Sequence, residues 1–384
     1  GVAVVCCLST QAVFKAPEFS TRGLTKTASA FAALTVRHPE LMRAIADEAV
    51  LRVGEMTAQS LGDLAWSYAA LQLQHHSLAK AISEAPGWVE RPPYEHCFQA
   101  GSVADCFKHV VLVMLLQHMI QDGRPFTYVD THAGSGIYDL ASQQALQHKK
   151  FEDGVLRFAS RACANRCLPP SVTAYLCALH ELNTALLRGT SVRHSGIRYY
   201  MGSSALAKMW LSRTARNAAV FFETSATACE ELKRNLALLD PHCKVPVEVL
   251  QEDGYLGLQR VIPLLCNDKA LIFLDPPYEL SFSDQLNAGL LRHLSESWPL
   301  SLSALWYPIM DEARTARVYQ RLQTMCLGPT LVAELKVGSV QTGVLLVRPP
   351  GHIPEELEEV LPVLVQLLGP LEDPAQTDSR VFWL

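Results

Sequence analysis

Short β-rich runs that alternate with helical stretches constrain the fold of this 384-residue chain more than any other feature. Helical patterns at residues 227–239 and 286–296 separate several of these runs, which lie at residues 126–130, 218–223, 245–250, 270–275, 303–307, 331–337 and 344–347. Strands that alternate with helices build a mainly parallel sheet with helices on its faces. The sequence therefore predicts an α/β domain over residues 91–384.

Two further features subdivide this domain. Residues 104–121 have the apolar stripe of a helix, which we expect to end at Gly123. The first strand ends at residue 130 and the second begins at residue 218, which is too far apart for a simple crossover. We therefore expect an inserted helical subdomain over about residues 138–200.

Basic residues cluster around this insertion. Residues 149–216 hold 11 Lys and Arg against three acids, whereas the whole chain has a formal net charge of -5. An acidic protein with one basic segment suits the docking of a structured polyanion on one face. A solvated helix surface would have the same charge pattern, so both interpretations stay open.

The first 90 residues contain an internal repeat. Residues 30–46 align without gaps to residues 67–83, a period of 37, and seven of the 17 positions are identical. The apolar positions have the spacing of one helical face: Leu34, Leu41 and Ile45 in the first copy, and Leu71, Leu78 and Ile82 in the second. Helical hairpins of this kind bury their faces by stacking. The pattern resembles the octotricopeptide-type repeats of organellar RNA-binding proteins, and prolines at 86, 92 and 93 end it.

Composition limits compartment and cofactors. The apolar runs at 110–116, 271–274 and 344–347 are much shorter than the ~20 residues of a membrane-spanning helix. The 11 cysteines form no CxxC pair or other metal-ligand spacing, so we expect no metal site, no disulfide framework and a reducing compartment. The chain begins at Gly1, so no targeting signal is assigned.

Small or acidic residues follow three of the predicted strands. The first strand leads into a G-x-G turn with Gly134 and Gly136, the second ends at Glu223, and the third precedes Asp253 and Gly254. A G-x-G turn lets the backbone approach a ligand closely. Glu223 would accept hydrogen bonds from a ribose diol, or would serve only as an acid at a helix N-terminus. Because ligands bind at the carboxyl ends of such strands, this loop order predicts a Rossmann-like class I S-adenosylmethionine-dependent methyltransferase fold.

The run LIFLDPPY at residues 271–278 narrows the chemistry. Two prolines directly after a buried strand fix an extended turn, so the Asp275 side chain and the Pro276 carbonyl project rigidly from the sheet. This pair of acceptors suits an exocyclic amine, and Tyr278 offers a flat face for a flipped base, worth ~1 to 3 kcal/mol. The run fits the [DNS]PP[YFW] motif of amino-group methyltransferases. The alternative is an ordinary turn that ends a strand.

From Tyr94 to its C-terminus the chain resembles the bacterial 23S ribosomal RNA adenine N(6)-methyltransferases of the RlmJ family. The matching stretches are YEHCFQAGSVADCFKH at 94–109, YVDTHAGSGIYDL at 128–140, RYYMGSSALA at 198–207, EDGY at 252–255, LDPPY at 274–278 and ALWYPI at 304–309. The resemblance implies S-adenosyl-L-methionine as methyl donor, large-subunit ribosomal RNA as substrate, no membrane association and a monomeric catalytic domain.

The resemblance also assigns residues. It implies that the methyl-donor pocket is lined by His109, His132, Ser203, Glu223, Asp253 and Gly254, with Lys108 close to it. Asp275 would be the catalytic acceptor, and Tyr94 and His96 would receive the RNA. The residues alone would make Tyr94 and His96 parts of a linker and His109 a histidine on a helix surface.

The chain departs from the family pattern at positions that we expect to contact RNA, namely Gln99, Ser102, Val103, Ile137, Ser204 and the loop at 338–343. Three alternatives to the ribosomal substrate therefore stay open. The same pocket would accept an adenine in another RNA or in DNA. The chain could also be a non-catalytic RNA-binding protein on a retained methyltransferase scaffold. The combination of bacterial-type catalytic sequence with organelle-style repeats favours a mitochondrion or chloroplast.

Overall fold

The computed structural model of the protein describes residues 12–33, 36–71, 73–85, 96–165, 167–187, 196–213, 216–239, 245–266, 268–278, 283–370 and 377–384. The chain forms two compact units. One consists of Gly1–Tyr94 with Pro277–Gly289, and the other consists of Glu95–Pro276 with Leu290–Leu384.

Two helical hairpins make up the N-terminal part of the first unit. The first hairpin is α2 (Thr21–Ala33) with α3 (Pro39–Leu51), and the second is α4 (Ala58–Ala70) with α5 (His76–Ser83). Corresponding helices begin at residues 21 and 58 and at residues 39 and 76, so they follow the 37-residue period. α2 packs on α4 and α3 on α5. This stacking buries the predicted apolar positions Leu41, Ile45, Leu71, Leu78 and Ile82, whereas Leu34 lies outside the described residues.

A histidine starts the second helix of each hairpin. Nδ1 of His38 accepts the backbone N–H of Leu41 at 3.1 Å, and Nδ1 of His75 accepts that of Leu78 at 3.2 Å. The first N–H groups of a helix have no partner within the helix, so a side-chain acceptor stabilises its start. The two copies therefore share their capping residue as well as their apolar face.

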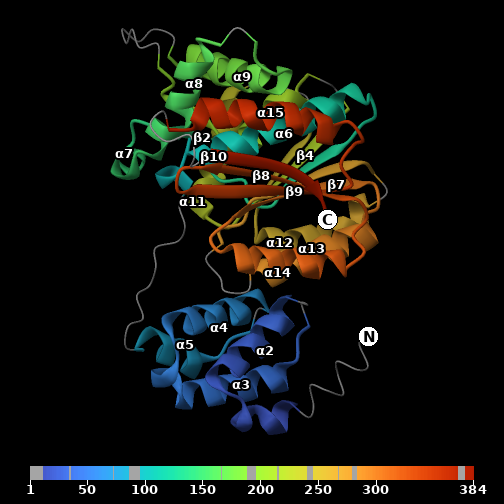
Figure 1. Ribbon diagram of the computed structural model, residues 1–384. Coiled ribbons are helices and arrows are strands. Elements are labelled where there is room, and N and C mark those ends of the chain that lie inside the picture. Colours follow the sequence, from blue (N-terminus) through green and yellow to red (C-terminus); the bar gives the residue numbers. More distant parts are fainter. Residues whose placement is uncertain are drawn as a thin grey trace. The chain divides into compact units, whose positions relative to one another are not determined.

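An eight-stranded sheet is the centre of the larger unit (Figure 1). Its order is β10-β8-β9-β7-β6-β1-β4-β5; β7, β6, β1, β4 and β5 are parallel, and β9, β8 and β10 extend the sheet in antiparallel pairing. The seven predicted runs all form strands of this sheet, which confirms a mainly parallel α/β fold. Their bounds are β1 Thr127–Asp130, β4 Ala218–Glu223, β5 Val247–Gln251, β6 Ala270–Leu274, β7 Ser301–Pro308, β8 Thr330–Val337 and β9 Val340–Val347.

Three strands are absent from the sequence prediction. β2 (Ile137–Asp139) and β3 (Tyr199–Met201) are only three residues long and pair antiparallel outside the main sheet. β10 (Thr377–Trp383) lies at the edge of the sheet, where none of its residues is fully buried. An edge strand of this kind has no continuous apolar run to reveal it.

A buried acid holds β10 to the sheet. Glu334 on β8 is bound by Arg380 of β10 and by the hydroxyls of Tyr307, at 3.2 Å, and Tyr319. The Glu334 side chain is 5% exposed. We refer to Glu334, Tyr307, Tyr319 and Arg380 as the Glu334 cluster.

Helices cover both faces of the sheet, with α6, α9 and α15 on one side and α12 and α14 on the other (Figure 1). The predicted helices at 227–239 and 286–296 correspond to α11 and α13. The helical elements of the chain beyond residue 95 are η3 His96–Phe98, α6 Val103–Gln121, α7 Gln143–His148, η4 Glu152–Leu156, α8 Arg157–Ala162, α9 Pro170–Leu186, α10 Ser203–Leu211, α11 Ala226–Leu239, α12 Gly254–Leu265, α13 Ser283–Ser297, α14 Glu312–Gln323 and α15 Ile353–Leu368.

The helix predicted at 104–121 is α6, but it has no solvent-facing stripe along most of its length. Residues 105–116 are all buried, because α6 packs against the sheet, α9, α10 and α15. Within the described part of the chain α6 alone has the length and hydropathy of a membrane-spanning helix, with a mean hydropathy of 1.5, and 78% of that window is buried inside the protein. Its apolar character is therefore that of a core helix.

Three of the basic residues at 149–216 bind to backbone carbonyls of the protein itself. Arg157 and Arg161 donate to backbone carbonyls at the C-terminus of α15, at 3.1 Å to Leu368 and 2.5 Å to Gly369 respectively. Lys208 is 8% exposed and donates to the carbonyl of Leu236 at 2.6 Å. Cations that bind the last carbonyls of a helix stabilise the helix, so Arg157 and Arg161 stabilise α15. The other described basic residues of the segment are exposed, namely Lys149, Lys150, Arg198, Arg213 and Arg216, so both interpretations of the charge stay open.

Candidate active site

The predicted site residues meet at one edge of the sheet. The strands β6, β1, β4 and β5 are neighbours, so their carboxyl ends lie side by side. His132, directly after β1, shows the convergence. Burial lowers its pKa, whereas the carboxylates of Asp253, Asp275 and Glu223 act on the same imidazole in the opposite direction. Carboxylates at the ends of β4, β5 and β6 thus act electrostatically on a histidine at the end of β1.

Hydrogen bonds from the turn to Tyr138 and Glu223 fix the conformation of the G-x-G turn. Gly134 has φ +58°, and a Cβ at this position would lie 2.1 Å from Oη of Tyr138. The Tyr138 hydroxyl accepts the backbone N–H of Ser135 at 3.1 Å, and the N–H of Gly134 donates to Oε2 of Glu223 at 3.0 Å. Only glycine fits at Gly134, because both the space and the left-handed backbone exclude other residues. The turn is thereby tied to the end of β4.

Two further carboxylates shape the ends of β4 and β5. Oε1 of Glu223 accepts the N–H of Ser225 at 2.8 Å, next to the start of α11. Asp253 caps α12, with Oδ1 accepting the N–H groups of Tyr255 at 3.0 Å and Leu256 at 3.1 Å. A Cβ at Gly254 would lie 2.0 Å from the carbonyl oxygen of Thr131, so α12 starts in direct contact with the loop after β1.

Asp130, the last residue of β1, is fully buried beneath this loop. Burial raises its pKa to about 6, although hydrogen bonds from Ser203, from the N–H of His132 at 3.1 Å and from Tyr128 at 3.0 Å oppose the shift. Ser203 is itself buried at the start of α10. It therefore supports the floor of the site through Asp130.

A line of four ionisable side chains begins at Asp275, the acid of the DPPY motif. Oδ2 of Asp275 lies 2.5 Å from Nζ of Lys108, which lies 2.7 Å from Oδ1 of Asp105. Oδ2 of Asp105 in turn lies 3.2 Å from Nε2 of His96. We refer to Asp275, Lys108, Asp105 and His96 as the Lys108 chain.

The ion pairs of the Lys108 chain are shielded from water, so the charges of their partners interact strongly. The side chains of Lys108 and Asp105 are 4% and 2% exposed, and Asp275 is 14% exposed. Burial alone would raise the pKa of Asp105, but the positive charges of His96 and Lys108 outweigh it and hold that pKa well below its usual range. Lys108 also lies 5.2 Å from the ring centroid of Trp306 on β7. The ammonium is thus held between two carboxylates over an aromatic face.

His109, the next residue on α6, faces the core. It is 1% exposed, and its Nδ1 lies 2.7 Å from the hydroxyl of Tyr200, which receives a hydrogen bond from Tyr175 at 3.0 Å. Burial holds the pKa of His109 well below its usual value. The alternative of a surface histidine is wrong, because the imidazole joins α6 to α9 and β3.

The remaining predicted residues are less completely described. Pro276 is buried after β6, and the Tyr278 hydroxyl receives a hydrogen bond from Asn287 at 3.1 Å. Tyr94 lies outside the described residues.

Sequence reasoning missed Asp105, Tyr138 and Trp306 as parts of this site. Asp105 had a usable signal, because it lies one helical turn before Lys108 in an otherwise apolar helix. Two of the departures from the family pattern also have structural roles. The Ser102 hydroxyl caps α6, and buried Ser204 donates to the carbonyl of Ala133 at 2.8 Å. The expectation that Ser204 contacts RNA is wrong.

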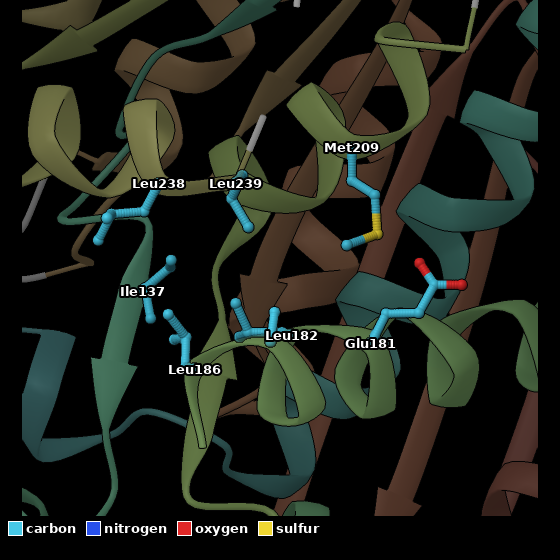
Figure 2. A pocket seen from close by; sticks show the side chains of 8 residues that line it. Ile137, Glu181, Leu182, Leu186, Met209, Leu238 and Leu239 are labelled. Atoms are coloured by element: carbon cyan, nitrogen blue, oxygen red, sulfur yellow. The ribbon is translucent and has the colours of Figure 1, made fainter. Parts of the chain in front are cut away.

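An apolar pocket of about 170 Å³ is lined by none of the predicted donor-pocket or catalytic residues. Figure 2 shows its lining, which comes from β2, α9, α10 and α11 and consists of Ile137, Glu181, Leu182, Ala185, Leu186, Met209, Leu238 and Leu239. Glu181 is its one charged side chain, so the pocket lacks the convergent polar groups found at the strand ends.

Known proteins provide an independent comparison. Two curated relatives, both called ribosomal RNA large subunit methyltransferase J, come from Escherichia coli and Haemophilus influenzae and are 27% and 26% identical to this chain. Each alignment covers 72% of this chain and 94% of the relative. A crystal structure of a Legionella pneumophila protein superposes with a TM-score of 0.62 at 23% identity, over 74% of this chain and 97% of that protein, which supports the fold.

The family model described as "Ribosomal RNA large subunit methyltransferase D, RlmJ" matches residues 123–384. This match spans the sheet, the glycine turn and the motif acid. The chain therefore belongs to the RlmJ family of ribosomal RNA large subunit methyltransferases.

Proposed function

We propose that this protein transfers a methyl group from S-adenosylmethionine to the exocyclic amine of an adenine in large-subunit ribosomal RNA. The observation that carries the proposal is the placement of Asp275 at the end of β6 beside the loops after β1, β4 and β5, which are joined to one another by the Gly134–Glu223 hydrogen bond and by the contact of Gly254 with Thr131. Family membership and the names of the two curated relatives support the ribosomal substrate.

The residues after β1, β4 and β5 fit the proposed methyl donor. S-adenosylmethionine supplies an electrophilic methyl group when it is bound. Because Gly134 has no side chain, the Tyr138 hydroxyl can pack against the turn and hold its backbone beside Glu223. Oε2 of Glu223 accepts one hydrogen bond, from Gly134, and Oε1 accepts two, from Ser225 and from the Thr224 hydroxyl. A carboxylate offers about four lone-pair positions, so Oε2 can also accept a ribose hydroxyl. Asp253 and Gly254 form the opposite wall at the start of α12.

Asp275 is the proposed acceptor for the adenine amine. The lone pair of this amine is delocalised into the ring, so the nitrogen is a poor nucleophile. Two acceptors, the Asp275 carboxylate and the Pro276 carbonyl, would hold the amine hydrogens and favour a pyramidal nitrogen. They would also stabilise the positive charge that develops on it. An ordinary carboxylate is too weak a base to remove the amine proton in advance, so proton loss accompanies or follows transfer.

Lys108 leaves room for this role. It contacts Oδ2 of Asp275, and a carboxylate offers about four lone-pair positions in total. Tyr278 is proposed to stack on the flipped base, worth ~1 to 3 kcal/mol. Tyr94 and His96 are proposed to receive the adjoining RNA.

The test is methyl transfer to protein-free large-subunit ribosomal RNA, with methylated adenines located by mass spectrometry. Wild-type protein should produce N6-methyladenine at one position. Asp275→Asn should lower kcat at least ~1,000-fold while changing the Kd for S-adenosylmethionine less than threefold, because the acceptor is lost and the donor contacts are kept.

Asp268→Asn is the matched control, because this exposed acid lies just before the opposite end of β6. It should behave like wild type. Transfer only to DNA or to unrelated RNA would overturn the ribosomal substrate. RNA binding without S-adenosylmethionine binding would indicate a retained scaffold in place of an enzyme.

A further inference from the structure

One buried carboxylate contacts both halves of the proposed site. Oδ1 of Asp105 lies 2.7 Å from Nζ of Lys108, and the same Nζ lies 2.5 Å from Oδ2 of Asp275. Oδ2 lies 3.2 Å from Nε2 of His96 and accepts the N–H of Gly101 at 2.9 Å. The Asp105 side chain is 2% exposed, so its influence reaches ligands through these neighbours.

The position of His96 is fixed from two sides. Asp105 lies on one side, and the Tyr138 ring lies on the other, with ring centroids 5.1 Å apart. The same Tyr138 closes the glycine turn through its hydrogen bond from Ser135. His96 therefore lies between the carboxylate that orders Lys108 and the tyrosine that shapes the donor turn.

Asp105 also affects how the N–H groups of Lys108 are shared between Asp105 and Asp275. An ammonium has three N–H groups, and here it faces one carboxylate on each side. Without the charge of Asp105, the nearest counter-charge to this buried cation would be Asp275 alone. Lys108 would then compete with the adenine amine for the Asp275 oxygens.

We propose that Asp105 is a positioning residue that sets both Lys108 against Asp275 and His96 against the incoming RNA. This inference rests on the proposed function and extends it, because one carboxylate then links amine activation to RNA placement. Loss of the Asp105 carboxylate lowers turnover through Lys108 and weakens RNA binding through His96. The proposed methyl-donor contacts at Glu223 and Asp253 stay in place.

The first test is the kinetics of Asp105→Asn on large-subunit RNA. We expect kcat to fall ~30 to 100-fold and the KM for RNA to rise ~5-fold or more, with the Kd for S-adenosylmethionine within twofold of wild type. Asp122→Asn is the matched control, because this acid ends the same helix and also binds a lysine, Lys269. It should stay within twofold on all three constants. Wild-type kcat and KM in Asp105→Asn would overturn the inference.

A double-mutant cycle separates positioning from a merely structural role. If Asp105 acts through His96, adding His96→Gln to Asp105→Asn should raise the KM for RNA little further. If the two effects multiply, the positioning role is wrong. Should Asp105→Asn fail to fold, the same cycle is made with His96→Gln and Lys108→Met. Multiplying effects on kcat/KM would there overturn the shared link through Asp105.

Hydrogen exchange tests the inference independently of the substrate. The Gly101 N–H donates to Asp105, and Asp105→Ala removes this acceptor. It should exchange at least ~10-fold faster in Asp105→Ala and at the wild-type rate in Asp122→Ala. Unchanged exchange in Asp105→Ala would overturn the inference for any substrate. Faster exchange in a protein that does not methylate large-subunit RNA would overturn the proposed function and support the positioning of residues 96–105.

Discussion

Two buried carboxylates in the same unit have similar burial and different consequences. Asp105 and Glu334 have side chains that are 2% and 5% exposed, and each is held by several donors. The partners of Asp105 lead to Asp275 at the carboxyl ends of the parallel strands. The partners of Glu334 lie on β7, α14 and β10, and they join the antiparallel edge of the sheet.

The comparison shows that burial and hydrogen bonding do not by themselves identify a functional acid. What differs is the position of the last partner. In the Lys108 chain it is an acid that directly follows a parallel strand, where ligands of α/β sheets bind. In the Glu334 cluster it is Arg380, 59% exposed on an edge strand. We therefore expect the first group to control catalysis and the second to control stability.

Lys108→Met tests the first half of this contrast and should give the largest effect of the four variants that address it. Loss of the ammonium leaves Asp105 and Asp275 without their shared cation, and we expect kcat to fall ~100 to 1,000-fold. The measurement is single-turnover methyl transfer at saturating donor. Turnover within threefold of wild type would place the Lys108 chain with the Glu334 cluster as a structural element.

Asp130→Asn should change how the free energy of unfolding depends on pH, which tests a third buried carboxylate, beneath the proposed site. The folded pKa of Asp130 is raised to about 6, so between its ordinary value and pH 6 the folded protein holds a proton that the unfolded chain releases. Wild-type stability should therefore fall as pH rises through this window, by up to about 3 kcal/mol, and the variant should lack this part of the decline. Urea unfolding at pH 4.5 and 7 measures it. A pH dependence identical in the two proteins would contradict the raised pKa.

Glu334→Gln tests the second half of the contrast. An amide cannot accept from both tyrosines and from Arg380 as a carboxylate does, so we expect the free energy of unfolding to fall by about 1 to 2 kcal/mol. Both kcat and the KM for RNA should stay within twofold of wild type. Chemical denaturation together with transfer kinetics measures both quantities. A stable variant with impaired turnover would break the comparison.

Arg198→Gln should have the smallest effect. Arg198 pairs with Asp139 at 2.9 Å, and both side chains are partly exposed, at 43% and 33%. Exposed pairs of this kind contribute about 0 to 1 kcal/mol. We expect unfolding and the KM for RNA to change little. A tenfold rise in this KM would show that the basic segment contacts RNA after all.

Much of the fold was predictable because its central strands are buried on both faces. Residues 270–274 read as a continuous apolar run and form β6, all of whose residues are buried. The rule that ligands bind at the ends of such strands then predicts from the sequence that Gly134, Glu223, Asp253 and Asp275 lie together. β10 escaped prediction because an edge strand mixes polar and apolar residues.

The Lys108 chain was only partly predictable. Asp105 and Lys108 have the spacing of an ordinary surface ion pair on a helix, and nothing local shows that α6 is buried on all sides. His96 joins them from a separate short helical turn, η3. Contacts of this kind depend on tertiary packing. For the same reason the sequence could not show which basic residues at 149–216 have partners inside the protein, as Arg161 has at the end of α15.

Strand β7 contributes one residue to each of the two groups, the Lys108 chain and the Glu334 cluster, so both depend on the pairing register of this strand. Trp306 lies beneath Lys108, and its neighbour Tyr307 donates to Glu334 from the opposite face of the sheet. Adjacent residues of a strand point to opposite sides, so a slip of β7 by one position would exchange these two rings. Methyl transfer and the closure of the sheet edge would then be lost together, and natural variation in this strand has to satisfy two unrelated demands at once.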